Sequence, residues 1–235
     1  MIYKDSFEVW FKWRDKIEGK DITQEEIKLM LQDLAFIDPV EKIFGGFFNK
    51  IIMILKNIKP QLAEYFNCKE DQILINYSYS KTGEKNKDAK IILGNANFTG
   101  LYDPKDVYPN LEKIYGNADF ENVFAKFPNL KRIYGNANFQ RNQQNFDNLE
   151  VIGGRADLRN CSSSFKNLKY ILEAVDLDHS HLTDFGKIRF TGKTFLLFVK
   201  NNRLRRKISK EFEFDKTRNR SYRKPQYLNQ DEKGM

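Results

Sequence analysis

The sequence predicts an α+β fold, in which a helical N-terminal cap precedes a solenoid of five or six short coils with a parallel β-sheet. Three observations support this fold class. Residues 1–67 carry helix signals, residues 89–199 repeat with a period near 19, and apolar and polar residues alternate within each repeat. We therefore divide the chain into a helical domain (1–80), a repeat solenoid (81–200) and a basic C-terminal segment (201–235), the end of which we expect to be disordered.

The first helix is expected to begin at Asp5 or Ser6, either of which can act as an N-cap, and to end near Gly19. Its core face is expected to hold four apolar side chains: Phe7, Trp10, Phe11 and Ile17. Trp13 lies three residues after Trp10 and can share that face. Alternatively, the two tryptophans are exposed and anchor a binding partner.

Further helix signals follow along the N-terminal domain. They stand at the Thr23-x-x-Glu26 capping box, the Asp38-Pro39 pair, the Gly45-Gly46 break and Pro60. Residues 72–79 alternate in polarity and predict a strand, and residues 81–90 read as a charged loop. Because a solenoid needs caps at its ends, we expect the helical domain to cover the first coil and shield its open edge.

A five-residue phrase, Gly-Asn-Ala-Asn/Asp-Phe, defines the repeat. Three clear copies and two degraded ones occur, at residues 94–98, 116–120, 135–139, 154–158 and 173–177. A sixth coil is expected around residues 192–196. In the copy at 133–139, Ile133, Gly135, Ala137 and Phe139 are expected to point inward, and the glycine and alanine allow close approach of another layer.

Other positions repeat with the same period. An asparagine followed by leucine recurs upstream of each phrase, at Asn110, Asn129, Asn148 and Asn167. An isoleucine follows three residues after each leucine, at Ile114, Ile133, Ile152 and Ile171. We expect the isoleucines to align on neighbouring coils, and we assign the asparagines to the scaffold, since a side-chain amide can bond backbone groups at a turn.

This unit resembles the leucine-rich-repeat family, on the evidence of Asn129-Leu130-x-x-Ile133-x-Gly135-x-Ala137-x-Phe139 and its sister copies. The unit is shorter than is usual in that family, and glycine and alanine occupy inward strand positions. The resemblance implies tightly wound coils and says little about function.

The outward positions of the strands form a candidate partner surface, because solenoids commonly bind other macromolecules. Its members are Tyr115, Tyr134, Asn117, Asn136, Asp119, Asn138, Arg155 and Asp157.

The basic C-terminal segment is the candidate polyanion-binding region. Residues 187–224 hold 14 Lys or Arg and 3 acidic residues, which is 14 − 3 = +11 in a chain of net charge +8. Its two clusters contain Arg203, Arg205, Arg206, Lys207, Lys210, Arg218, Arg220, Arg223 and Lys224. Aromatic residues lie between and beside them, a pattern suited to RNA. An acidic protein surface, or a tail that only aids solubility, are the alternatives.

The absence of certain motifs bears on the compartment of the protein and on whether it holds a cofactor. Residues 1–5 show no apolar signal-peptide core, and the longest apolar run, residues 51–55, is too short to span a bilayer. We therefore expect a cytoplasmic protein without membrane contact, monomeric when alone. No cofactor motif or zinc spacing is present, and the two cysteines suit reduced thiols.

These observations predict a non-enzymatic binding protein, an adaptor or inhibitor that uses the solenoid for a protein or ribonucleoprotein partner and the basic segment for RNA. The composition permits, and no motif indicates, a phage anti-CRISPR inhibitor of an RNA-guided, RNA-targeting nuclease. One alternative is a structural, self-associating repeat module. Another is an unrecognised nuclease, with candidate residues Asp176, Asp178, His179 and His181.

Overall fold

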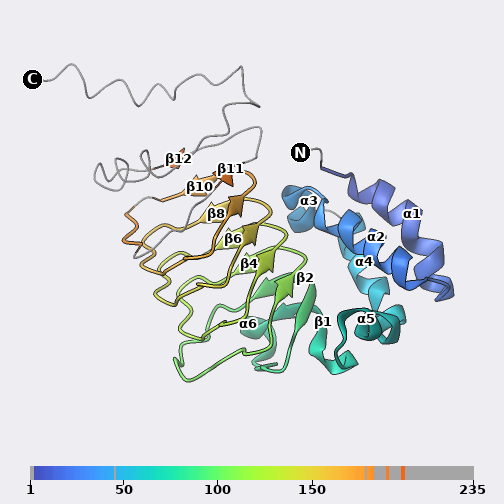
Figure 1. Cartoon of the computed structure of the whole chain (residues 1–235), viewed down its shortest axis with the longest axis horizontal. Helices are drawn as coiled ribbons and strands as arrows, with labels where there is room; N and C mark the ends of the chain where they lie inside the picture. Colours follow the sequence, from blue (N-terminus) through green and yellow to red (C-terminus); the bar gives the residue numbers. More distant parts are fainter. Residues whose placement is uncertain (1–2, 45, 178, 183–188, 191–196, 199–235) are drawn as a thin grey trace, which may run out of the picture.

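A computed structural model describes residues 3–44, 46–177, 179–182, 189–190 and 197–198. It confirms the predicted fold class: a helical region is followed by a parallel β-solenoid of about five turns. Figure 1 shows the coils stacked on one another, with the helices standing along one side of the stack.

The helices of the N-terminal region begin at the expected signals. Helix α1 (Ser6–Gly19) starts after Asp5, whose carboxylate accepts the N–H groups of Phe7 and Glu8, and α2 (Gln24–Ala35) starts at the predicted capping box. The remaining helical elements are α3 (Pro39–Phe44), α4 (Gly46–Ile54), the 3₁₀ helix η1 (Leu55–Ile58), α5 (Lys59–Phe66), the 3₁₀ helix η2 (Glu70–Gln72) and α6 (Tyr79–Thr82).

The predicted core face of α1 is right for Ile17 and for Trp13, but wrong for Phe7 and Phe11. Phe7 and Phe11 are 51% and 65% exposed, and Trp10 is only half-buried. The buried face follows an i, i+4, i+8 series instead, Val9, Trp13 and Ile17. Trp13 fixes this choice, because its indole Nε1 donates a hydrogen bond to the buried Asp33 carboxylate at 2.8 Å.

The strands form two parallel ladders that are joined through β2 (Ile91–Asn97), which pairs with β1 (Ile73–Ser78) at the start of the stack. The first ladder continues through β3 (Lys113–Ile114), β5 (Arg132–Ile133), β7 (Val151–Ile152), β9 (Tyr170–Ile171) and β11 (Arg189–Phe190). The second ladder continues through β4 (Ala118–Asp119), β6 (Ala137–Asn138), β8 (Ala156–Asp157), β10 (Val175–Asp176) and β12 (Leu197–Phe198). The expected sixth phrase, residues 192–196, lies outside the described residues.

The register confirms the predicted alignment of the repeats. Ile133 stands opposite Ile114 and Ile152, and Ile152 stands opposite Ile171. The predicted inward positions Gly135, Ala137 and Phe139 are all buried. Two of the asparagines that precede a leucine in each repeat, Asn129 and Asn148, donate to backbone carbonyls of the preceding coil, at 2.6 and 2.7 Å. These bonds confirm their scaffold role.

After β2, which runs through its Gly-Asn step as one strand, the following coils each bend between the two ladders at the equivalent position. At the bend a row of amide side chains, which we call the asparagine ladder, replaces strand pairing: Asn76, Asn95, Asn117 and Asn136. Each Oδ1 accepts the backbone N–H of the corresponding residue in the next coil, at 2.6–2.8 Å. The ladder therefore satisfies N–H groups that the bend removes from the sheet.

The solenoid core is built from two stacks of aromatic rings. One contains Phe98, Phe120 and Phe139, with neighbouring centroids 4.9 and 5.2 Å apart. The other contains Tyr108, Phe127, Phe146 and Phe165. Rings of the two stacks meet edge to face, as Phe120 and Phe127 do at 4.9 Å, so each coil locks into its neighbours.

The helical region covers one side of the first coil and continues along the stack, so it does not shield the open edge of that coil as predicted. Its apolar core includes Ile91, Leu93 and Tyr115 from the outer face of the first ladder. At the far end, the Tyr3 hydroxyl donates to the carbonyl of Gly153 in the fourth coil, at 3.3 Å. The first coil is covered by β1, so the helices act as a lateral support.

Lys42 on α3 joins the helices to the solenoid. Its side chain is fully buried, and its Nζ donates to the carbonyls of Ala35 at 3.1 Å and Tyr134 at 2.7 Å. The Lys42 carbonyl accepts from the amide of Asn95 at 2.9 Å. Burial lowers the pKa of Lys42 to about 7, against the opposing effect of two nearby carboxyl groups, those of Asp38 and Glu173.

Lys42 is expected to make stability rise with pH. Between its folded pKa of about 7 and its ordinary value of 10.5, the unfolded chain holds a proton that the folded chain lacks. The free energy of unfolding should therefore rise with pH in this window, by up to about 1.4 kcal/mol per unit, and the Lys42→Met variant should lack this contribution. Urea unfolding of both proteins between pH 7 and 9 measures the difference, and parallel pH profiles would contradict the prediction.

Candidate binding groove

A polar groove crosses the outer face of the second ladder and spans four coils. It has a volume of about 490 Å³. Its floor and walls are formed by Asn95, Ala96, Asn97, Asn117, Ala118, Asp119, Asn136, Ala137, Asn138, Arg155, Asp157 and Arg159. The alanine side chains belong to the solenoid core, and the polar side chains stand at equivalent positions of successive coils.

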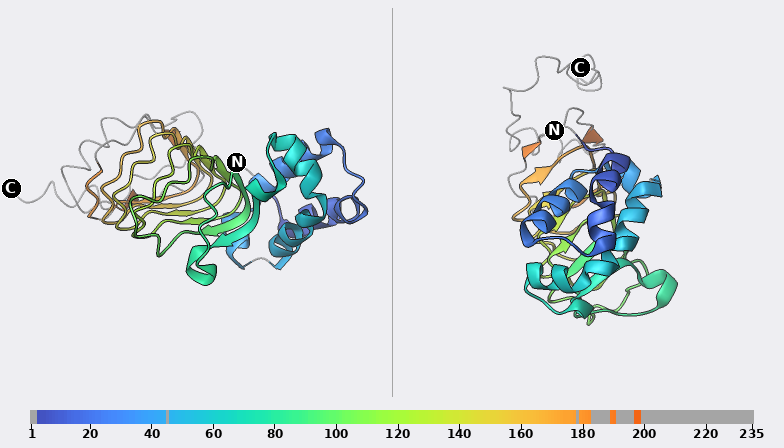
Figure 2. Two further views of the ribbon diagram at one scale, coloured as in Figure 1. Left: turned by 90° about the horizontal axis from the view of Figure 1, so that it is seen from below. Right: turned by 90° about the vertical axis from the view of Figure 1, so that its right-hand side faces the viewer.

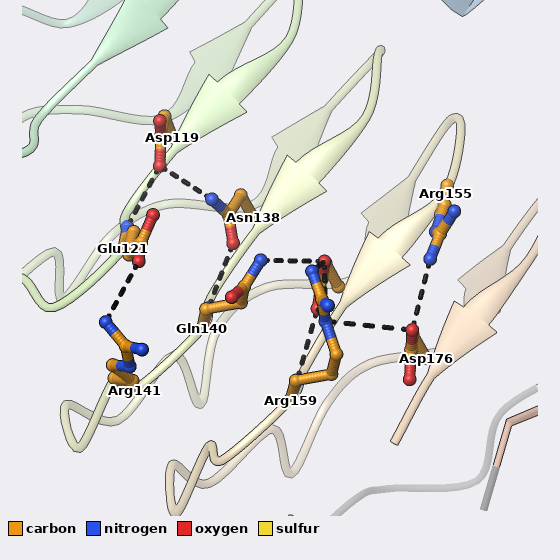
Figure 3. Close-up of polar contacts among 9 residues, drawn as sticks. Asp119, Glu121, Asn138, Gln140, Arg141, Arg155, Arg159 and Asp176 are labelled. Atoms are coloured by element: carbon orange, nitrogen blue, oxygen red, sulfur yellow. Dashed lines mark hydrogen bonds and ion pairs between the residues drawn. The ribbon is translucent and has the colours of Figure 1, made fainter. Parts of the chain in front are cut away.

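One row of the groove is held by turns of the backbone. Asp119 and Asn138 each accept, through Oδ1, the N–H group two residues further on, both at 3.0 Å. The same side chains are linked across coils, because Asn138 Nδ2 donates to Asp119 Oδ1 at 3.1 Å. Figure 3 shows this chain of contacts continuing through Gln140, which donates to Asp157 at 2.9 Å. The row is thus fixed before any partner arrives.

The C-terminal end of the groove carries both charges. Asp176, only 8% exposed, lies 3.1 Å from the Arg155 guanidinium and 3.7 Å from that of Arg159 (Figure 3). Arg159 also pairs with Asp157 at 2.7 Å. The two guanidinium groups are thus balanced by two carboxylates, and both arginine side chains remain partly exposed.

The middle of the groove has an acidic group and an unused donor. Burial raises the pKa of Asp119, because its charged form loses hydration, although the bonds from Glu121 and Asn138 oppose this. Asn117 Nδ2 is buried and has no hydrogen-bond partner among the described residues. Such a groove offers acceptors, donors and paired charges, which suits recognition of a polar chain more than of an apolar ligand.

The structure gathers six of the eight predicted surface residues in this groove: Asn117, Asp119, Asn136, Asn138, Arg155 and Asp157. The other two lie on the outer side of the first ladder. Tyr115 is 4% exposed, since it packs against Phe66 of α5 and stacks on Tyr134 at 4.8 Å. The helical region covers Tyr115 and half-buries Tyr134. The prediction that these two tyrosines belong to the partner surface is therefore corrected.

Sequence reasoning missed several groove residues. Asn95 and Asn97 are the first copy of the predicted rows, and Arg159 follows two residues after Asp157. The repeat itself was the signal, because equivalent residues of each coil fall on one face.

The other candidate residues are placed as follows. Every residue of the predicted polyanion-binding set, Arg203 to Lys224, lies outside the described residues, and so does Asp178. Within the part of the chain that the structure describes, no group of three or more His, Cys, Asp or Glu side chains could hold a metal ion. Asp176, a residue of the nuclease alternative, is paired with arginines.

Among the described residues, each helix is too short or too polar to cross a membrane. A scan against protein-family models found no match, and neither the curated proteins nor the solved structures contained one. The groove is therefore the main indication of function.

Proposed function

We propose that this protein is a non-enzymatic binding module whose groove receives a protein or ribonucleoprotein partner. The observation that carries the proposal is the repetition of fixed amide and carboxylate groups over four coils. Parallel strands place such rows about 4.8 Å apart, so a partner lying across the coils meets similar contacts at each step.

The fixed geometry supports a binding role. Asn136 and Asn138 hold backbone N–H groups through their Oδ1 atoms, so their remaining polar atoms point in set directions. A partner then pays little additional entropy for ordering these side chains. We further propose that the basic C-terminal segment contacts RNA or another polyanion in the same complex. An anti-CRISPR role is one use of such a module; no family match supports it, and the proposal does not depend on it.

The groove is tested by removing Arg155 from its lining together with Gln140, which holds the lining residue Asp157. The Gln140→Ala, Arg155→Ala double variant should reduce partner binding by about tenfold or more, because groove contacts at the centre of an interface carry most of its energy. Affinity purification from the native host identifies the partner, and titration of the purified partner measures the loss.

A matched control is available on the same solenoid. Lys131 and Lys169 are exposed, lie outside the groove, and make only surface ion pairs, at 3.9 and 3.3 Å. The Lys131→Ala, Lys169→Ala variant should bind normally. Equal binding by the groove variant and the control would refute the groove proposal.

The basic segment is tested through the salt dependence of RNA binding. Replacing Arg203, Arg205, Arg206 and Lys207 with alanine should weaken binding to single-stranded RNA. The slope of log affinity against log salt should become shallower by up to about 3, since each lost phosphate contact contributes about 0.7. Fluorescence anisotropy over a salt series measures this slope. An unchanged affinity and slope would remove nucleic acid from the proposal.

A further inference from the structure

Strand β1 has one open edge. Strands β3 to β8 each pair with a strand on both sides, whereas β1 pairs only with β2 among the described residues. A strand at the end of a sheet presents a row of unpaired N–H and C=O groups on its outer side. The left view of Figure 2 looks onto this end of the stack.

A second groove follows this edge. It has a volume of about 300 Å³ and is lined by all six residues of β1. One wall carries Lys56 of η1 and Lys59 of α5, and the other is formed by Thr82, Glu84 and Asn86.

Both apolar cores of the molecule end at this strand. Leu74 packs against the solenoid core, and Ile75 packs against the core beneath the helices. Both residues remain partly exposed and line the groove. Because successive side chains of a strand point to opposite faces, a segment added beside β1 would extend the solenoid core with one set of alternate residues and turn the other set toward the helices.

The charge of the groove selects the kind of partner. Lys56 and Lys59 have no ion-pair partner among the described residues, whereas Lys85 and Lys87 on the neighbouring loop are paired with the buried Asp106, at 2.8 and 2.6 Å. The two unpaired ammonium groups attract an acidic segment. Glu84, on the opposite wall, disfavours acidic residues on its own side, so acidic side chains should face the lysines.

From these observations, we infer that the outer edge of β1 binds an extended, acidic peptide segment of a partner protein, which adds a strand to the solenoid sheet. The backbone bonds of the added strand supply affinity, and alternate apolar and acidic side chains supply specificity. This site lies at the end of the stack, so it is independent of the polar groove on the second ladder.

The experiment uses the full chain and a capped peptide of six residues, as long as β1, in which valine and glutamate alternate. Fluorescence anisotropy should detect binding, and a peptide with lysine in place of glutamate should bind about tenfold more weakly or worse. Two further peptides carry N-methyl groups on alternate amides, in opposite phase. One of the two should lose binding, because only one phase of amides faces β1.

The methylated peptides also remove an ambiguity. The basic C-terminal segment attracts any acidic peptide, but the two methylated peptides have the same charge. Equal binding of both would therefore overturn the proposal, since charge alone would then explain the affinity.

Protein variants complete the test. The Lys56→Glu, Lys59→Glu variant should bind the acidic peptide about tenfold more weakly. The control, Lys105→Glu with Lys126→Glu, makes the same charge change at exposed solenoid positions and should have no such effect. Equal losses in both variants would overturn the proposal. So would a concentration-dependent dimer, seen by size-exclusion chromatography, that excludes the peptide, because a second copy would then occupy the edge.

Discussion

Replacing Gly116 with alanine is expected to destabilise the protein by about 3 kcal/mol or more, the upper end for overpacking in a core. A Cβ atom at this position would lie 2.4 Å from the backbone carbonyl of Gly94 in the preceding coil, and 2.5 Å from the Oδ1 of Asn95. Neither neighbour can move freely. The Asn95 oxygen accepts the N–H of Asn117, and strand pairing holds the two coils together. Chemical denaturation gives the change in the free energy of unfolding.

Gly19→Ala is the matched control for Gly116→Ala. Gly19 is the last residue of α1, and a Cβ there would meet no atom within 4 Å. Alanine at this site should leave stability unchanged or raise it by less than about 1 kcal/mol, because it restricts the unfolded chain. If both variants unfold at the same denaturant concentration, close packing of the coils at the Gly-Asn bend is contradicted.

The second large effect is expected for Phe120→Ala, at about 3–5 kcal/mol. The Phe120 ring is fully buried and contacts four others: Phe98, Phe139, Phe127 and Phe146. Removing it leaves a cavity in both aromatic stacks, and the coils on either side cannot close it while their strands remain paired. Thermal or urea unfolding measures the loss.

Phe11→Ala provides the comparison for a phenylalanine on the surface. Phe11 is 65% exposed and its ring contacts Phe7 at 6.1 Å. Its replacement should cost less than about 1 kcal/mol. Similar losses for Phe11→Ala and Phe120→Ala would mean that the interlocked rings contribute no more than exposed ones.

Much of the fold follows from local signals in the sequence. Helix α2 begins where Thr23 and Glu26 form a capping box, and the isoleucines of successive repeats stand opposite one another. These features depend on nearest neighbours, either along the helix or in the next coil. They can therefore be predicted without knowing how distant parts of the chain meet.

Features that depend on distant contacts were predicted less well. The face of α1 was partly misassigned because Phe7 and Phe11 are as apolar as Val9, and only the bond between Trp13 and Asp33 of α2 distinguishes the two faces. The lateral position of the helices also escaped prediction. Tyr115 looked like an exposed strand residue, yet it is the residue that the helical region covers.

The sequence predicted the residues at the centre of the candidate groove but not those at its margins. Asp119, Asn138 and Asp157 were predicted because they alternate with inward residues. Arg159 lies beyond the strand, on a turn whose direction depends on the side-chain oxygen of Asp157 accepting its N–H at 3.2 Å. Side-chain control of a turn is not visible in an alternating pattern.

The contacts between the helical region and the solenoid also restrict the number of repeat units in the first four coils. Lys42 reaches the third coil through the Tyr134 carbonyl, and Tyr3 reaches the fourth through Gly153. Deleting or duplicating a unit between the first and fourth coils would bring a non-matching coil under each of these residues. The helical region thus fixes the number of repeat units before Gly153. Units beyond Gly153 can be gained or lost without disturbing these two contacts.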